Sequence, residues 1–175
     1  MLTLTDLLRQ EANGMYAATE GLIRLVDRDK LGWKPATGQN WMTTGQLVQH
    51  LTNACGAMIK GFVTGDWGMP AGTKIEDLPP DQMLPPAEKM PAAMSIDAVL
   101  AALAADKAMA LEYIGKAGEA NLLTRRMVAP WGGPEVTLYQ HLMTSLQHLG
   151  QHKGQLFYYL KLQSKDVNTM HLWGM

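Results

Sequence analysis

Apolar residues in the first part of the chain recur three and four positions apart, which is the spacing of one face of an α-helix. This pattern predicts a first helix over about Leu4–Asp29, carried by Leu4, Leu7, Leu8, Met15, Leu22, Ile23 and Val26. Thr3 and Asp6 have the spacing of a capping box at its start. Gly32 and Pro35, which disfavour helix, follow its end.

A second apolar stripe predicts a helix over about Thr44–Thr64, and Thr43 with Gln46 repeats the capping spacing before it. The segment from Asp66 to Ala93 then holds six of the nine prolines, which predicts a long, irregular but ordered crossover. Two domains joined by this segment are the alternative, but neither half would have enough helix or sheet to close its own core. We therefore expect one domain over residues 1–175.

A third helix is predicted over Ile96–Ala117, with Ser95 as its cap. A fourth helix opens with the capping pair Thr137 and Gln140 and continues to about Gln163. The alternating pattern of a β-strand does not stand out anywhere in the sequence. Four helices of similar length predict an all-α fold, a four-helix bundle. The long crossover between helices two and three would let these two helices run in the same direction.

Three of the five histidines lie on one face of the fourth predicted helix. His148 lies about 20° around the helix from His141, and His152 lies about 40° from His148. His148 and His152 are one turn apart, so both rings can reach one metal ion at about 2.0–2.1 Å. Such a pair alone is more typical of a solvated helix face.

His50 is the only other histidine inside a predicted helix, and its neighbours Leu47, Leu51 and Ala54 face inward. It is therefore either a half-buried histidine bonded to a carbonyl or a third ligand from a facing helix. Three histidines from two helices would hold one ion and leave a coordination position open, which is typical of catalytic rather than structural metal sites.

Other features of this region limit the class of metal site and the residues that could be ligands. A zincin helix needs HExxH, but Leu149 stands where the glutamate would be. Cys55 lies about 140° around the helix from His50, so it is a poor ligand and is expected to be a small buried helical residue. Gly150 and Gly154 each cost about 1 kcal/mol in a helix interior. They either allow a close approach of helices around a site or are simply tolerated by the packing.

Composition excludes several classes of protein. Hydrophobic residues make up 47% and charged residues 18%, which is a globular composition. The net charge is -1 and no basic block occurs, so we expect no nucleic-acid partner. A single cysteine fits a reducing compartment, and neither a signal peptide nor a membrane span is recognisable. We therefore expect a cytoplasmic protein with no membrane partner.

Two stretches contain the candidate ligands: WKPATGQNWMTTGQLVQHLTNA around His50, and PWGGPEVTLYQHLMTSLQHLGQHKGQLFYYLKLQ around His148 and His152. The first resembles the segment of DinB-like proteins in which a Trp–Pro turn precedes a helix with one metal histidine. The second resembles their last helix with its HxxxHxGQ signature. The resemblance implies an up-down-down-up bundle, often a homodimer, with zinc or nickel bound by His50, His148 and His152. It gives no ligand role to His141, which we expect to pack or to lie behind the ligands.

Relatives of this kind include metal-dependent transferases and isomerases that use low-molecular-weight thiols such as bacillithiol, mycothiol or glutathione. The resemblance therefore implies a metal-dependent enzyme acting on a small-molecule substrate, either a thiol S-transferase or an enzyme of related detoxification chemistry. The alternative is a non-enzymatic metal-binding bundle of a stress response. No Asp or Glu is placed on the ligand face of helices two or four, so no catalytic acid or base is predicted.

Overall fold

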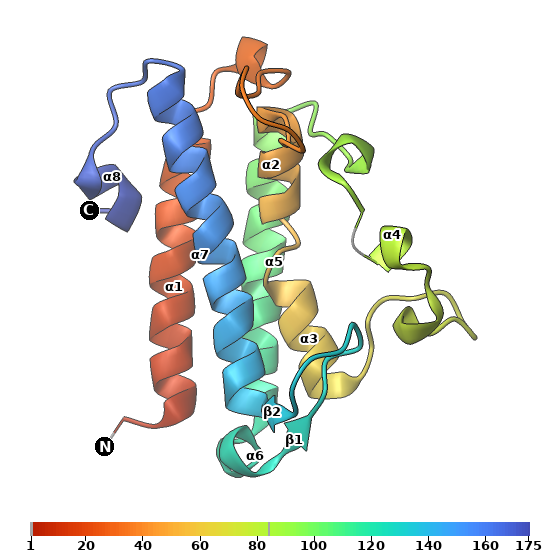
Figure 1. Cartoon of the computed structure of the whole chain (residues 1–175). Coiled ribbons are helices and arrows are strands. Elements are labelled where there is room, and N and C mark those ends of the chain that lie inside the picture. The colour runs from red at the N-terminus through yellow and green to blue at the C-terminus, as the bar shows by residue number, and fades with distance from the viewer. Residues whose placement is uncertain (1, 84) are drawn as a thin grey trace.

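The protein is mostly helical, which confirms the predicted all-α class. A computed structural model describes residues 2–83 and 85–175 (Figure 1). Its α-helices are α1 (Leu4–Ile23), α2 (Thr44–Leu51), α3 (Gly56–Thr64), α4 (Pro80–Met83), α5 (Ile96–Ala117), α6 (Glu119–Thr124), α7 (Leu138–Leu162) and α8 (Thr169–Trp173). Short 3₁₀ helices are η1 (Arg28–Lys30), η2 (Ile75–Asp77) and η3 (Ala87–Lys89), and two short strands are β1 (Arg126–Met127) and β2 (Val136–Thr137).

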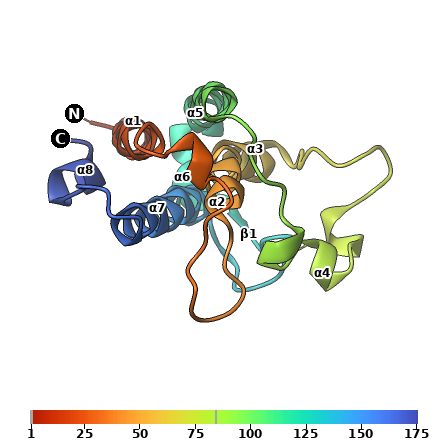
Figure 2. The same cartoon turned by 90° about the horizontal axis from the view of Figure 1, so that it is seen from above.

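The long helices pack around a shared apolar core. Helix α1 packs against α5 and α7, α3 packs against the same two helices, and α2 packs against α7. Fully buried residues from these helices fill the space between them, among them Leu8, Leu51, Ile114, Leu142 and Leu149. The segment between α3 and α5, which includes α4, lies to one side of the long helices (Figure 2). Among the described residues, no helix is both long enough and apolar enough to cross a membrane.

The predicted helix starts are accurate. Capping boxes are formed by Thr3 with Asp6, by Thr43 with Gln46 and by Thr137 with Gln140. The hydroxyl of Ser95 accepts from the N–H of Ala98, so α5 begins where predicted. Capping is a local interaction between residues three apart, which is why sequence alone locates it.

The predicted end of the first helix is wrong. Helix α1 stops at Ile23, not at Asp29, because the chain turns back toward the start of α2. The carbonyls of Leu31 and Trp33 accept hydrogen bonds from the N–H groups of Gly45 and Thr44, at 2.7 and 2.8 Å. The turn thus satisfies N–H groups that the first turn of a helix leaves unpaired.

The predicted second helix is also wrong as a continuous element. It is divided into α2 and α3 by a break over residues 52–55. The carboxylate of Asp106 on α5 accepts the N–H groups of Gly56 at 2.9 Å and of Ala57 at 3.2 Å. Asp106 therefore caps α3 from a neighbouring helix, and Gly56 allows that approach because a Cβ there would collide with the main chain of Asp106. No local sequence pattern records a cap supplied from 50 residues away.

Strands β1 and β2 form an antiparallel ribbon that the sequence did not reveal, with Arg126 opposite Thr137 and Met127 opposite Val136. Two residues are too few to show an alternating pattern. The two glycines of α7 differ in their surroundings. A Cβ on Gly154 would meet nothing within 4 Å, whereas one on Gly150 would meet only the side chain of Met15. Packing therefore tolerates Gly154 rather than requiring it.

Candidate metal centre

The structure brings together His50 of α2 with His148 and His152 of α7. The Nε2 atom of His148 lies 3.3 Å from Nε2 of His50 and 3.0 Å from Nε2 of His152. One ring nitrogen from each of the three residues lies within 4.8 Å of the others. The three side chains are half-buried, and they come from two helices that pack directly against each other.

The orientation of His148 is set by the break between α2 and α3. Its Nδ1 atom lies 3.0 Å from the carbonyl oxygen of Ala54, inside that break. A carbonyl can only accept a hydrogen bond, so Nδ1 of His148 carries the proton. Nε2 of the neutral ring then presents a lone pair toward the other two histidines.

The orientation of His152 is set by a chain of hydrogen bonds along α7. The hydroxyl of Tyr159 donates to the carbonyl of Met42 at 2.8 Å, and the amide of Gln155 donates to Tyr159 at 3.2 Å. The oxygen of Gln155 is left to accept from Nδ1 of His152, at 3.0 Å. Nε2 of His152 therefore also presents a lone pair to the cluster. The sequence analysis did not single out Gln155 or Tyr159, although their spacing of three and seven residues from His152 places both near the histidine face.

Burial and the neighbouring rings lower the pKa of two of these imidazoles, His50 and His152. Burial, followed by the nearby rings of His152 and His148, lowers the pKa of His50 to about 4. Burial also lowers the pKa of His152, against the opposing effect of its hydrogen bond to Gln155. Neutral imidazole is the form that binds metal ions.

Two of the three separations between the ring nitrogen atoms fit a shared metal ion. Two ligands about 2.05 Å from one ion are about 2.9 Å apart at a right angle and about 3.4 Å apart at a tetrahedral angle. The observed separations of 3.0 and 3.3 Å fall in this range. Moreover, the lone pairs of His148 and His152 face each other at hydrogen-bond distance with no proton between them in the neutral forms. A cation between them would remove this repulsion, so the three residues fit a divalent ion.

A cavity of about 680 Å³ opens beside the cluster, and His50 and His148 form part of its lining. Its other walls come from α3, α7, the segment between α3 and α5, and the loop between β1 and β2. This volume is ordinary for a small-molecule site. None of the described residues that line it is Asp or Glu, so the lining offers no carboxylate as a general acid or base.

His141 and Cys55 lie apart from the cluster. The ring of His141 stacks on Phe62, with centroids 4.1 Å apart, and its Nε2 bonds the carbonyl of Met127 at 3.0 Å. It therefore packs between α3 and β1. Cys55 is buried as predicted, but it lies in the break before α3 rather than inside a helix. Burial raises the pKa of its thiol to about 12, so the thiol is not poised to ionise.

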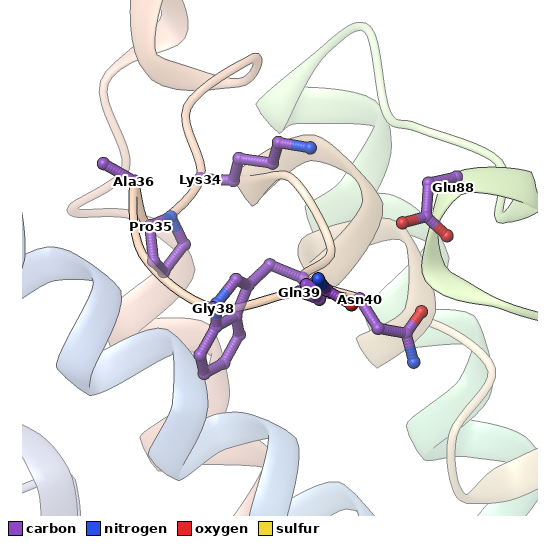
Figure 3. A pocket seen from close by; sticks show the side chains of 8 residues that line it. Lys34, Pro35, Ala36, Gly38, Gln39, Asn40 and Glu88 are labelled. Atoms are coloured by element: carbon purple, nitrogen blue, oxygen red, sulfur yellow. The ribbon is translucent and has the colours of Figure 1, made fainter.

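A second hollow, of about 600 Å³, lies in the loop that precedes α2 (Figure 3). Trp41 folds over Gly38 in this loop and donates its indole N–H to the carbonyl of Thr37 at 2.7 Å. Lys34 and Glu88 give the hollow its charges (Figure 3). No histidine is among its described lining residues, so it is not the candidate metal centre.

Comparison with known families agrees with this picture. The sequence model of the DinB superfamily matches residues 12–156, a span that includes His50, His148 and His152. The chain therefore belongs to the DinB superfamily, as the resemblance implied. No curated protein and no solved structure matches the chain significantly.

Proposed function

We propose that His50, His148 and His152 bind one divalent metal ion and that the protein is a metal-dependent enzyme acting on a small molecule in the adjoining cavity. The observation that carries this proposal is the approach of the Nε2 atoms of His148 and His152 to 3.0 Å, with His50 and His148 in the lining of that cavity. All-imidazole sites suit zinc and nickel among other ions, and zinc or nickel is the ion we propose.

Thiol S-transfer, or related detoxification chemistry, is the reaction we propose. A divalent ion held by the three histidines would lower the pKa of a coordinated thiol and so favour the thiolate that attacks an electrophile. In such a transfer the sulfur forms a bond to the electrophilic atom, the leaving group departs with its electron pair, and the thiol proton goes to solvent. The chain itself contributes neutral groups that can orient a ligand, among them Asn53 and Gln147 at the cavity. The apolar walls of the cavity would exclude water around the reacting atoms.

The architecture we propose for this site is a four-helix bundle in up-down-down-up order, in which α2 and α3 together form the second helix. Support comes from the packing of α1 against α5 and α7, and of α2 and α3 against the same two helices. The ribbon directions in Figure 1 and the proline-rich segment before α5 are consistent with this order. A homodimer and a cytoplasmic location also stay predictions. Sedimentation at micromolar concentration tests the predicted dimer. Finding a monomer there would contradict it.

A non-enzymatic metal-binding role is the second candidate. The specific observation that favours it is the lack of any carboxylate among the described residues that line the cavity. A turnover assay with glutathione, bacillithiol and mycothiol against a panel of electrophiles separates the two. Turnover that depends on the metal supports the enzyme, and its absence with all three thiols supports the binding protein.

The metal itself is tested by measuring bound ion per chain after loading with zinc or nickel. We expect one ion per chain in the wild type. His50→Ala, His148→Ala and His152→Ala should each weaken binding by more than about a hundredfold, since even indirect ligand supports are worth about 10–100-fold. His171→Ala is the matched control, because His171 lies on α8 outside the cluster. Full metal content in His148→Ala would refute the site.

A further inference from the structure

The cavity beside the three histidines differs chemically from a site for a charged metabolite. We propose that it binds an uncharged, largely apolar organic molecule. The proposal rests on the function given above and deepens it, because it names the class of electrophilic substrate, as distinct from the thiol, that the cavity would take.

The walls of the cavity are apolar and adaptable. Met58 of α3, with Ile75, Met83 and Met90 from the segment before α5, line it together with Trp131. Methionine side chains are flexible and polarisable, so they fit irregular apolar ligands. A partly exposed Trp131 offers a flat face on which an aromatic ring can stack.

The polar lining is neutral. Asn53, Thr144, Gln147 and Gln151 line the cavity in addition to the histidines, and no Lys, Arg, Asp or Glu is among its described lining residues. Exposed charged residues occur in the same segment as the apolar wall, for example Glu76 next to Ile75. They are not part of the lining. A ligand carboxylate held against this lining, away from the metal, would lose water without gaining a cationic side chain as a partner, which is costly.

The apolar wall is held in place by α2. The side-chain amide of Gln46, one turn before His50, donates to the carbonyls of Ala87 and Met90 at 2.7 and 2.8 Å. The N–H of Ala93 donates to the carbonyl of Gly45 at 2.9 Å. The same helix therefore carries a candidate metal ligand and fixes Met90 near it, so the wall and the cluster form one built site.

Trp131 is held in place by other aromatic side chains. It packs edge-on against Phe62 and Trp67, with ring centroids 5.7 Å away in both cases. Phe62 in turn stacks on His141. Through this stacking, His141 supports the aromatic wall of the cavity, which is a role that does not involve the metal. The hollow of Figure 3 makes the contrast clear, because Lys34 and Glu88 line that one.

The test compares three ligands that share a ring and a thiol and carry a neutral, an anionic or a cationic group at the para position. They are 4-methylbenzyl mercaptan, 4-(mercaptomethyl)benzoate and 4-(mercaptomethyl)benzylamine. Affinities are measured by calorimetry for the full chain, both zinc-loaded and metal-free. We expect the neutral ligand to bind at least about tenfold more tightly than either charged one in both forms, since about 1.4 kcal/mol of lost solvation gives that ratio. Equal or tighter binding of a charged ligand, or no binding of any of the three, overturns the proposal.

The same measurements distinguish failure of the proposed metal site from failure of the proposed substrate class. If no metal is taken up but the metal-free protein still prefers the neutral ligand, the metal site is wrong and the substrate class stands. If metal is taken up without a charge preference, the metal site stands and the substrate class is wrong.

Variants locate the binding to this cavity. Trp131→Ala should weaken binding of the neutral ligand at least about fivefold, since stacking on an aromatic residue is worth about 1 kcal/mol or more. Trp173→Ala, at an exposed tryptophan on α8, should leave it unchanged. Thr144→Lys, at an exposed position one turn before His148, should selectively strengthen binding of the carboxylate ligand. No gain for the carboxylate in Thr144→Lys, or equal losses in the two tryptophan variants, contradicts the proposal.

Discussion

The Nδ1 atom of His148 lies 3.0 Å from the carbonyl oxygen of Ala54, in the break between α2 and α3. In a continuous helix this carbonyl would bond the N–H four residues later and point along the helix axis. The break turns it toward α7 instead. An interruption of one helix thereby sets which ring nitrogen of a candidate ligand on another helix faces the cluster.

Asp106 is the residue that maintains this break, so its substitution should affect both stability and the site. It is 5% exposed and accepts hydrogen bonds from Gly56, Ala57 and the hydroxyl of Tyr16, the last at 2.6 Å. Asp106→Asn places an NH₂ group against these donors and should cost about 2–3 kcal/mol of unfolding free energy. Urea denaturation measures the loss.

The matched control is Asp97→Asn in the first turn of the same helix. Asp97 pairs with Arg28 at 3.1 Å, but both side chains are more than three-quarters exposed. Its substitution should change stability by less than about 0.5 kcal/mol. Equal effects of the two substitutions would show that Asp106 has no special role.

Gln155 should control metal affinity through His152. Gln155→Leu removes the acceptor that holds the proton on Nδ1 of His152, while the ring itself remains. We expect metal affinity to fall by about 10–100-fold, which is typical for the loss of a partner behind a ligand. Competition with a chelator measures this affinity. Gln10→Leu, at an exposed glutamine on α1 outside the cavity lining, should keep it. Unchanged metal affinity in both variants would argue against an effect of the hydrogen bonds that link Met42 to His152.

Acid should destabilise the metal-free protein over a defined range. The pKa of His50 is about 4 in the folded protein and about 6.5 in the unfolded chain. Between these values the unfolded chain binds a proton that the folded protein does not, so stability falls as the pH falls from about 6.5 to about 4. The lowered pKa of His152 acts in the same direction. For His50 the loss should be about 2–3 kcal/mol.

Chemical denaturation of metal-free protein across this pH range measures the effect, and His50→Gln is the control because it should flatten part of the curve. In the metal-loaded protein, protons compete with the ion for three imidazoles, so we expect the metal to leave steeply between about pH 4 and 6. Metal retained at pH 3 would exclude an all-histidine site.

Two glycines should respond oppositely to the same substitution. Gly154→Ala places a methyl group in open space inside a helix and should stabilise the protein by about 0.5–1 kcal/mol. Gly56→Ala drives a methyl group into Asp106 and should destabilise it by more than about 2 kcal/mol. Thermal melts compare the two. A destabilised Gly154→Ala variant would mean that this position is covered in solution, as the predicted dimer would allow.

The sequence by itself determined the local features of the protein. Capping pairs such as Thr43 with Gln46 and the apolar spacing of each helix depend on residues three or four apart, so they located the helix starts and the all-α class. The spacing of one helical turn between His148 and His152 was visible for the same reason. His50 was a candidate third member because it is the only other histidine inside a predicted helix and its neighbours face inward.

Only the tertiary structure decided the features that depend on contacts between distant residues. Asp106 divides the second helix from 50 positions away, and Gln46 fixes a wall at Met90. His141 shares the face of the candidate ligands in sequence but stacks on Phe62, because the ribbon after α6 brings Met127 to its ring. Helical periodicity gives the direction in which a side chain points. It does not give the partner that meets it, because that partner is set by how the helices pack.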